Sequence, residues 1–130
     1  MCAIFGFTGF QDKNLINKMS KDQEFRGPDE FNQYSNEKLS IGNNRLSVMD
    51  VKNGNQPFFS TDNKFVTVYN GMIYNFKDIR NFLIKKNINF KSDSDTEVLV
   101  NSYMYWGDKC FNHFDGCLLY TSDAADDANC

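Results

Sequence analysis

The order of the predicted helices and strands is the feature that most constrains the fold of this chain. Three short strand-forming segments, at residues 31–35, 39–43 and 65–70, follow one predicted helix and precede two others. Regular βαβ alternation, which a doubly wound parallel sheet requires, is not present in this order. The sequence therefore predicts an α+β fold built as a sheet sandwich.

The beginning of the chain is apolar and then amphipathic. Residues 1–9 carry Ile4, Phe5 and Phe7, which predicts a buried strand at the N-terminus. Asp12 can cap a helix over residues 13–23, because its carboxylate can accept from the first free backbone N–H groups.

Two further helices are predicted in the second half of the chain. One covers residues 76–86, with Asn75 as its cap. The other follows the S-x-x-E spacing of Ser94 to Glu97, which is typical of a capping box, and stops at Gly107.

Composition and charge exclude several classes of protein. The 130 residues suffice for one domain, and 41% hydrophobic with 24% charged residues argues against disorder. The net charge of −3, without a basic cluster, predicts no nucleic-acid partner and no anionic membrane partner. Because no apolar run approaches the ~20 residues of a membrane span and the N-terminus makes a poor signal peptide, we expect a cytoplasmic protein.

The last fourteen residues differ in composition from the rest of the chain. They hold three of the four alanines and no Lys, Arg or Phe. Such a break without a linker is more typical of an artefact, such as translated adapter read-through, than of a domain boundary. We expect residues 1–116 to form a partial domain and residues 117–130 to be a non-native tail.

Cys2 is the first residue with chemical interest. Removal of Met1, which is favoured before a small side chain, would leave Cys2 with a thiol and a free α-amine. Both groups exchange protons near neutral pH, so one residue can supply nucleophile and base together. The position alone is weak evidence, since most proteins with a cysteine there make no use of it.

Six motifs in order strengthen the case for Cys2. They are MCAIFGF at 1–7, FRGPDE at 25–30, NRLSVMD at 44–50, GNQP at 54–57, YNGMIYNFKDIR at 69–80 and SDTEVL at 94–99. This series resembles the class II glutamine amidotransferases, and residues 1–116 resemble the glutaminase domain of glutamine-hydrolysing asparagine synthetases. The resemblance implies an N-terminal nucleophile (Ntn) hydrolase-type αββα sheet sandwich, truncated after Gly116.

The resemblance also implies a reaction and its partners. Cys2 attacks the side-chain amide of glutamine, ammonia leaves, and the resulting thioester is hydrolysed to glutamate. In the family the ammonia passes to a synthetase domain, missing here, where ATP and Mg²⁺ activate aspartate. We expect no metal or cofactor in residues 1–116 and a homodimer at full length.

Five residues match functional positions of the family. The Asn70 side chain and the Gly71 backbone N–H match the donors to the oxyanion, although a plain Asn-Gly hairpin turn is the alternative. Arg45 matches the clamp on the α-carboxylate of glutamine, and Asp95 matches the residue that holds its α-ammonium. The alternative for Asp95 is helix capping. With the nucleophile Cys2, these residues define a glutamine-shaped site.

Other motif residues are expected beside the site. Arg26, Pro28 and Asp29 match a segment that orders its surroundings, and Gln56 with the following proline shapes a loop. Arg80 is expected to pair on a helix surface.

Two positions depart from the family pattern. Ala3 stands where glycine usually follows the nucleophile, and Met72 replaces the glutamate of the NGEIYN element. The lost carboxylate removes a contact to the substrate ammonium that is worth about 1–3 kcal/mol where it is buried. These changes motivate one alternative, a glutamine-binding module that has lost catalysis.

Further alternatives concern the acceptor and a metal. The same domain serves other acceptors in surface-polysaccharide or secondary-metabolite synthesis, and nothing in residues 1–116 decides between them. Cys110, His113, Cys117 and Cys130 have side chains that suit zinc, but two of them lie in the tail. Because the family's sandwich uses strands beyond Gly116, we expect exposed apolar faces, low stability and little activity.

Overall fold

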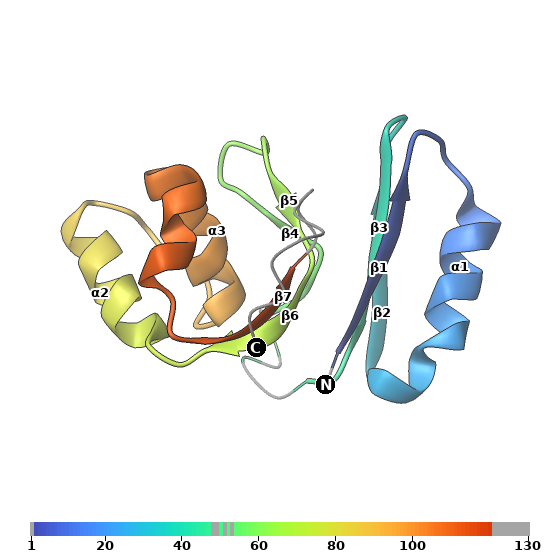
Figure 1. The fold of residues 1–130 in the computed structure, drawn as a ribbon, viewed down its shortest axis with the longest axis horizontal. Coiled ribbons are helices and arrows are strands. Elements are labelled where there is room, and N and C mark those ends of the chain that lie inside the picture. The colour runs from blue at the N-terminus through green and yellow to red at the C-terminus, as the bar shows by residue number, and fades with distance from the viewer. Residues whose placement is uncertain (1, 48–49, 51, 53, 121–130) are drawn as a thin grey trace.

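A sheet and one helix form from the first third of the chain. The computed structural model describes residues 2–47, 50, 52 and 54–120, and within them this sheet has the antiparallel order β1-β3-β2. Its strands are β1 (Ala3–Thr8), β2 (Glu30–Ser35) and β3 (Leu39–Arg45), and helix α1 (Lys13–Asp22) covers one face of the sheet (Figure 1). Ala3 lies opposite Asn44, so the beginning of β1 meets the end of β3.

The interface between α1 and this sheet is small. Its buried apolar side chains are Ala3, Phe5 and Ile16, with Phe7 and Met19 partly buried beside them. Side chains alternate along a strand, so Ile4 and its neighbours Cys2 and Gly6 point to the opposite face of the sheet.

The second half of the chain builds a larger helical layer on a short antiparallel pair of strands. Its elements are β6 (Tyr69–Ile73), α2 (Phe76–Lys85), α3 (Asp95–Trp106) and β7 (Gly116–Tyr120), and β6 pairs with β7. The buried core joins the sheet to both helices and consists of Tyr69, Ile73, Ile79, Leu83, Val98 and Leu99. Six further aromatic or aliphatic side chains, among them Trp106 and Phe111, pack against this core with Leu118 of β7.

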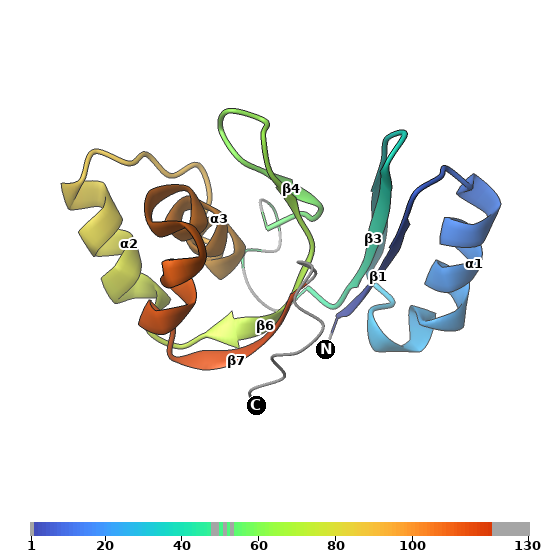
Figure 2. The same ribbon diagram turned by 45° about the horizontal axis from the view of Figure 1, so that its top comes forward.

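The two halves stack as layers. The strands of the second half face the first sheet, while α1 lies on one outer side and α2 with α3 on the other (Figures 1 and 2). The short hairpin of β4 (Phe58–Phe59) and β5 (Val66–Thr67) lies between them, and Phe59 meets Tyr34 of β2 at a ring-centroid distance of 5.2 Å. Short 3-10 turns, Glu24–Arg26 and Gly107–His113, follow α1 and α3. This arrangement confirms the predicted α+β class.

The structure corrects two of the predicted elements. The strand expected over residues 65–70 is divided, because β5 ends at Thr67 and β6 begins at Tyr69 and continues to Ile73. Asn75 does not cap α2 with its side chain; that side chain donates to His113 O at 2.9 Å and accepts from Asp115 N at 3.0 Å.

The capping box of α3 forms only in part. The Ser94 hydroxyl accepts from Glu97 N at 3.2 Å, as predicted. The Glu97 carboxylate, however, accepts from the backbone N–H groups of Lys91 and Ser92 at 2.8 and 2.6 Å, and so it closes the preceding loop.

The expected boundary after Gly116 falls at the start of a strand. Residues 116–120 form β7 in register with β6, with Cys117 opposite Met72. The rest of the expected tail, residues 121–130, lies outside the described residues. Among the residues that are described, no helix is long and apolar enough to cross a membrane.

Candidate functional site

Cys2 lies directly before β1 and over the end of β3. Leu46 N donates to its sulfur at 3.4 Å, and the sulfur lies 3.7 Å from Leu46 O. Because Ala3 is opposite Asn44, continuing the register by one residue places Cys2 opposite Arg45. The thiol is half-buried, so it is held by a fixed backbone while remaining accessible.

Arg45, the last residue of β3, is fixed by the loop that follows it. The residue is 4% exposed, and its guanidinium donates to Asn55 Oδ1 and to Asp50 O, each at 2.8 Å. Glu30 of β2, its cross-strand partner, forms an ion pair with it at 3.4 Å. A guanidinium can bind a carboxylate through two parallel hydrogen bonds, and a substrate carboxylate would have to replace some of these partners to do so here.

The RGPD segment contacts the backbone around Cys2 and Arg45. Arg26 Nε donates to Cys2 O at 3.4 Å. Asp29 N donates to Arg45 O at 3.1 Å, and its carboxylate accepts from Ser47 N at 2.7 Å. These contacts agree with the predicted role of Arg26 and Asp29 in ordering the surroundings of the site.

Asn70 and Gly71 lie inside β6, so the alternative of an Asn-Gly hairpin turn is wrong. They pair with Leu119 and Leu118 of β7. A Cβ added at Gly71 would lie 2.4 Å from Cys117 O, so β7 itself requires glycine at this position. Tyr69 and Ile73 point into the helical core, and by strand alternation Asn70 and Met72 point toward the first sheet.

Asp95 is the first residue of α3 and lies behind β6. Its side chain is 6% exposed, and Oδ2 accepts from Tyr69 Oη at 3.0 Å and from Ile73 N at 3.1 Å. Ser94 is the N-cap of the helix, so capping does not account for Asp95. Its carboxylate instead joins the beginning of α3 to both ends of β6.

Burial raises the pKa of Asp95 above its usual range, because desolvation penalises the charged carboxylate. The hydrogen bonds from Ile73 N and from the Tyr69 hydroxyl oppose this effect and lower the pKa. The pKa of Tyr69 is raised, first by its own burial and then by the charge of Asp95, so its hydroxyl remains a donor.

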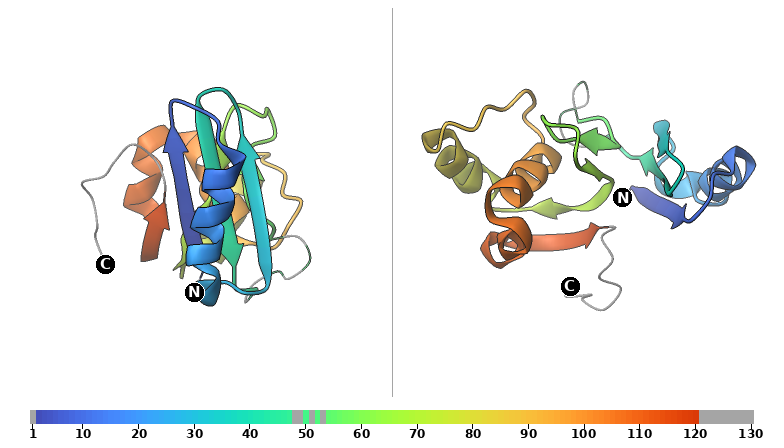
Figure 3. Two further views of the ribbon diagram at one scale, coloured as in Figure 1. Left: turned by 90° about the vertical axis from the view of Figure 1, so that its right-hand side faces the viewer. Right: turned by 90° about the horizontal axis from the view of Figure 1, so that it is seen from above.

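The five predicted site residues form two groups. Cys2 and Arg45 lie together at one end of the first sheet, whereas Asn70, Gly71 and Asp95 lie together on β6 and α3. Two views show the beginning of β6 beside the N-terminal end of β1, and these strands are in contact (Figures 1 and 3). The two groups therefore meet where the layers come together.

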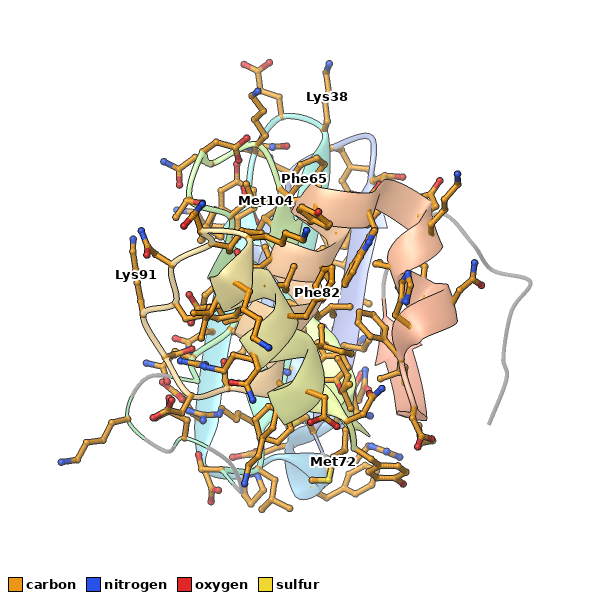
Figure 4. All side chains as sticks on the ribbon, turned by 90° about the vertical axis from the view of Figure 1, so that its left-hand side faces the viewer. Lys38, Phe65, Met72, Phe82, Lys91 and Met104 are labelled. Atoms are coloured by element: carbon orange, nitrogen blue, oxygen red, sulfur yellow. The ribbon has the colours of Figure 1, made fainter. Side chains whose placement is uncertain are left out.

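The two departures from the expected motifs lie on β1 and β6, the strands that carry or adjoin the site residues. Ala3 is buried in the interface with α1, so its methyl group points away from the face that carries Cys2. Met72 is 39% exposed and lies at the end of the molecule opposite to Lys38, the tip of the β2–β3 hairpin (Figure 4).

Two other motif residues bind backbone and side chains away from Cys2. Gln56 is buried, accepts from Tyr69 N at 2.5 Å and donates to Thr96 Oγ1 at 3.4 Å. Arg80 donates to Ser92 O at 2.6 Å and pairs with Asp93 at 3.3 Å. Gln56 thus does more than shape its loop, because it joins that loop to β6 and α3.

The alternative zinc site has no support in the described part of the chain. There, no group of three or more His, Cys, Asp or Glu side chains could hold a metal ion. Cys110 is buried, which raises the pKa of its thiol to about 12, and His113 stacks on Trp106 at a ring-centroid distance of 4.3 Å. Cys130 lies outside the described residues.

Sequence reasoning missed Tyr69 as part of the site. Its hydroxyl meets Asp95 across 26 residues of chain, a separation that no local pattern reveals. The sequence signal that could have indicated it is the alternation of side chains along a strand. This alternation places Tyr69 and Gly71 on the same face of β6, the face that packs against the helix beginning at Asp95.

Comparison with known proteins connects this site to a family. The sequence pattern of the family described as "Glutamine amidotransferase domain" matches residues 1–125. The chain is 34% identical over 127 residues to asparagine synthetase (glutamine-hydrolyzing) 3 of Bacillus subtilis, covering 92% of this chain and 21% of that protein. The match to a probable asparagine synthetase (glutamine-hydrolyzing) of Schizosaccharomyces pombe is 37% over 133 residues, covering 95% of this chain and 23% of that protein.

A plant relative shows the same coverage. Asparagine synthetase (glutamine-hydrolyzing) 1 of Arabidopsis thaliana is 33% identical over 125 residues, covering 92% of this chain and 21% of that protein. The chain therefore spans about a fifth of the length of the curated relatives that it matches.

Proposed function

Since this chain belongs to the glutamine amidotransferase domain family, we propose that it hydrolyses the side-chain amide of glutamine with Cys2 as nucleophile. The observation that carries the proposal is the position of Cys2. Its sulfur accepts from the backbone N–H of Leu46, the residue after Arg45, at the end of the sheet where the two groups of site residues meet. Removal of Met1 makes Cys2 the N-terminal residue.

The chemistry is acyl transfer in two steps. The α-amine of Cys2 accepts the thiol proton, and the sulfur forms a bond to the amide carbon of glutamine. When the tetrahedral intermediate collapses, the carbon–nitrogen bond breaks and the proton passes to the leaving ammonia. Water then attacks the thioester, the carbon–sulfur bond breaks, and glutamate and the free thiol are released.

The developing oxyanion needs donors that are already in place. We assign the Asn70 amide and the Gly71 N–H to this role. The pairing of β6 with β7, which fixes the backbone at both residues, supports the assignment. A donor of this kind is worth about 3–4 kcal/mol of transition-state stabilisation.

The two charged ends of free glutamine require separate partners. We assign the α-carboxylate to Arg45, whose fork is fixed by Asn55 and Asp50, and the α-ammonium to Asp95. Met72 contributes no charge at the ammonium end of the substrate. Asp95 therefore contributes a larger share of ammonium binding here than in family members that have glutamate at position 72.

The proposal extends to the fold and to the longer protein. The order helix, sheet, sheet, helix supports an Ntn hydrolase-type αββα sandwich (Figure 1). We place the partial glutaminase domain in residues 1–120, because β7 pairs with β6 and Leu118 packs against the core, and we limit the proposed non-native tail to residues 121–130. The names of the relatives support asparagine synthesis as the process served, with ammonia delivered to aspartate by a synthetase domain that binds ATP and Mg²⁺. We place this function in the cytoplasm and in a homodimer.

Glutamate release by the purified chain tests the proposal. Mass spectrometry first establishes that Met1 has been removed. We expect slow release of glutamate that is abolished in Cys2→Ala and retained in the matched variant Cys110→Ala. Cys110 is a suitable control because burial raises the pKa of its thiol and so disfavours the reactive thiolate. Equal rates in the chain and in Cys2→Ala would overturn the enzymatic proposal.

The second candidate function is a glutamine-binding module, and Met72 is the observation that favours it. The same experiment separates the two candidates when thermal melting is measured with and without glutamine. A melting temperature that rises with glutamine, together with equal glutamate release in both proteins, would favour the binding module.

A further inference from the structure

Tyr69 is a buried, titratable residue to which the proposed reaction gives no role. We propose that its hydroxyl is a positioning group, which holds the Asp95 carboxylate as an oriented anion for the ammonium group of the substrate. This inference rests on the proposed function and adds to it a residue that determines how the amino acid end of glutamine is recognised.

The geometry places two donors on one oxygen of Asp95. Tyr69 Oη lies 3.0 Å and Ile73 N lies 3.1 Å from Oδ2. Tyr69 is 2% exposed, so little water is available to replace its hydroxyl. Two donors from opposite ends of β6 fix both the position of this oxygen and the rotation of the carboxylate.

Tyr69 is itself held at two points. Its backbone N–H donates to Gln56 Oε1, and Gln56 Nε2 donates to Thr96 Oγ1, the residue after Asp95. The ring packs in the core with Ile73 and Leu99. The hydroxyl therefore cannot turn away from Asp95 without disturbing the loop, the strand and the helix together.

Asp95 needs such a donor because burial favours its neutral acid form. A protonated Asp95 would lose its attraction for an ammonium group. Hydrogen bonds to the charged form work in the opposite direction, and the Tyr69 hydroxyl and Ile73 N both stabilise the anion. Met72 supplies no second carboxylate, so the ionisation of Asp95 decides binding at this end of the substrate.

Other charged or titratable groups lie on the elements packed around Asp95, and three of them, Glu97, Asp93 and Arg80, are engaged elsewhere. They are Tyr74 after β6, Cys117 on β7, Glu97 on α3, Lys91 and Asp93 in the preceding loop and Arg80 on α2. Glu97 accepts from backbone N–H groups of that loop, and Arg80 binds Ser92 O and Asp93. The causes that move the pKa of Asp95 are burial and hydrogen bonds, and the Tyr69 hydroxyl is the side-chain donor among them.

Tyr69→Phe isolates the hydroxyl, because the ring and its packing remain. The matched control is Tyr105→Phe, which removes a hydroxyl from the exposed side of α3. The carboxyl carbon of Asp95 is followed by NMR as a function of pH in the full chain and in both variants, with Asp95→Asn to assign the signal.

We expect the Asp95 titration to move upward by about one pH unit in Tyr69→Phe and to stay in place in Tyr105→Phe. Because the anion binds the ammonium group, the acid limb of kcat/KM for glutamine should move upward by the same amount. Below that limb, KM should rise about tenfold while kcat changes by less than about twofold.

The outcomes distinguish this inference from the proposed function. An Asp95 titration that is unchanged in Tyr69→Phe would overturn the inference, whatever the rate of glutamate release. A purely structural role would lower the melting temperature and leave both the titration and the acid limb unchanged. Absence of Cys2-dependent glutamate release would overturn the proposed function, and the NMR titration would still decide whether Tyr69 controls Asp95.

Discussion

The two halves of the molecule bury different kinds of side chains between sheet and helix. Under α1, the end of the central strand β3 is polar, since Asn44 donates to Ser20 O at 2.6 Å and accepts from the Ser20 hydroxyl at 2.7 Å. Between β6 and its two helices the interface is apolar, with Ile73 and Leu83 fully buried. Among the described residues of the second half, buried polar side chains lie on α3 and in the loop before it, from Ser92 to Ser102.

This difference follows the division of the proposed site. Cys2 belongs to the half in which hydrogen bonds help to join the helix to the sheet. Hydrogen bonds depend on direction as well as distance, so they fix the backbone around the nucleophile. Asn70 and Asp95 belong to the half in which apolar packing joins β6 to its helices, and Asp95 is held there by hydrogen bonds from Tyr69 and Ile73. Helix and sheet are therefore joined partly by hydrogen bonds in the first half and by apolar packing in the second, where hydrogen bonds orient Asp95.

Replacing one buried isoleucine in each half gives the largest expected effect. Ile73 and Ile16 are both 0% exposed. Ile73→Ala should lower the free energy of unfolding by about 4 kcal/mol, and Ile16→Ala by about 3 kcal/mol, because a single helix can relax into its cavity more readily. Urea unfolding of both variants measures the two losses. A larger loss at Ile16 would reverse the comparison.

Asn70 tests whether the proposed site draws on both halves. Asn70→Ala should reduce kcat for glutamine about 100- to 1,000-fold, close to 3 kcal/mol in activation free energy, since it removes one oxyanion donor. Asn81→Ala, an exposed change on α2, is the control. Steady-state glutamate release with unchanged far-UV circular dichroism measures the effect. An unchanged kcat would confine the chemistry to the half that carries Cys2.

The helices were largely predictable from the sequence, and the strand pairing was not. The bounds of α1, α2 and α3 lie close to those expected, because periodicity and the caps Asp12 and Ser94 are local signals. The Asn70–Gly71 pair resembled the end of a strand, since the partner that extends β6 to Ile73 is a segment almost fifty residues later. Strand pairing depends on distant sequence, which a local pattern does not contain.

The motifs predict individual site residues, whose roles stay a proposal, but the contacts that support these residues could not be predicted. Cys2 and Arg45 could be expected together once β1 and β3 were paired. The bonds from Tyr69 to Asp95 and from Gln56 to Thr96 join segments that are 26 and 40 residues apart. Such contacts follow from the packing of α3 behind β6, and they decide how the predicted residues are oriented.

Substitutions in the Ser20–Asn44 pair test how much hydrogen bonding contributes to the stability of the first half. Asn44→Ala should lower the free energy of unfolding by about 2 kcal/mol, because it leaves the buried Ser20 hydroxyl and Ser20 O without this partner. Ser20→Ala combined with Asn44→Ala should cost less than the sum of the single changes. Strict additivity in this double-mutant cycle would show that the pair does not stabilise the half, and the comparison would fail.

Asp95→Asn should have the smallest effect on stability and a clear effect on function. The amide oxygen can still accept from Tyr69 Oη and Ile73 N, while the cost of burying a charge disappears. Because burial raises the pKa of Asp95, its ionisation destabilises the folded state above that pKa, and this destabilisation is absent below the unfolded pKa of a carboxyl group. Asp95→Asn should therefore be as stable as the parent chain at pH 7, or more stable by up to about 1 kcal/mol, and this difference should vanish toward pH 4. Urea unfolding at both pH values, with glutamine affinity measured in parallel, tests the expectation. If the variant is less stable at pH 7 and binds glutamine normally, Asp95 is a structural group of the second half. It would then contribute to stability and not to substrate binding, contrary to the proposal.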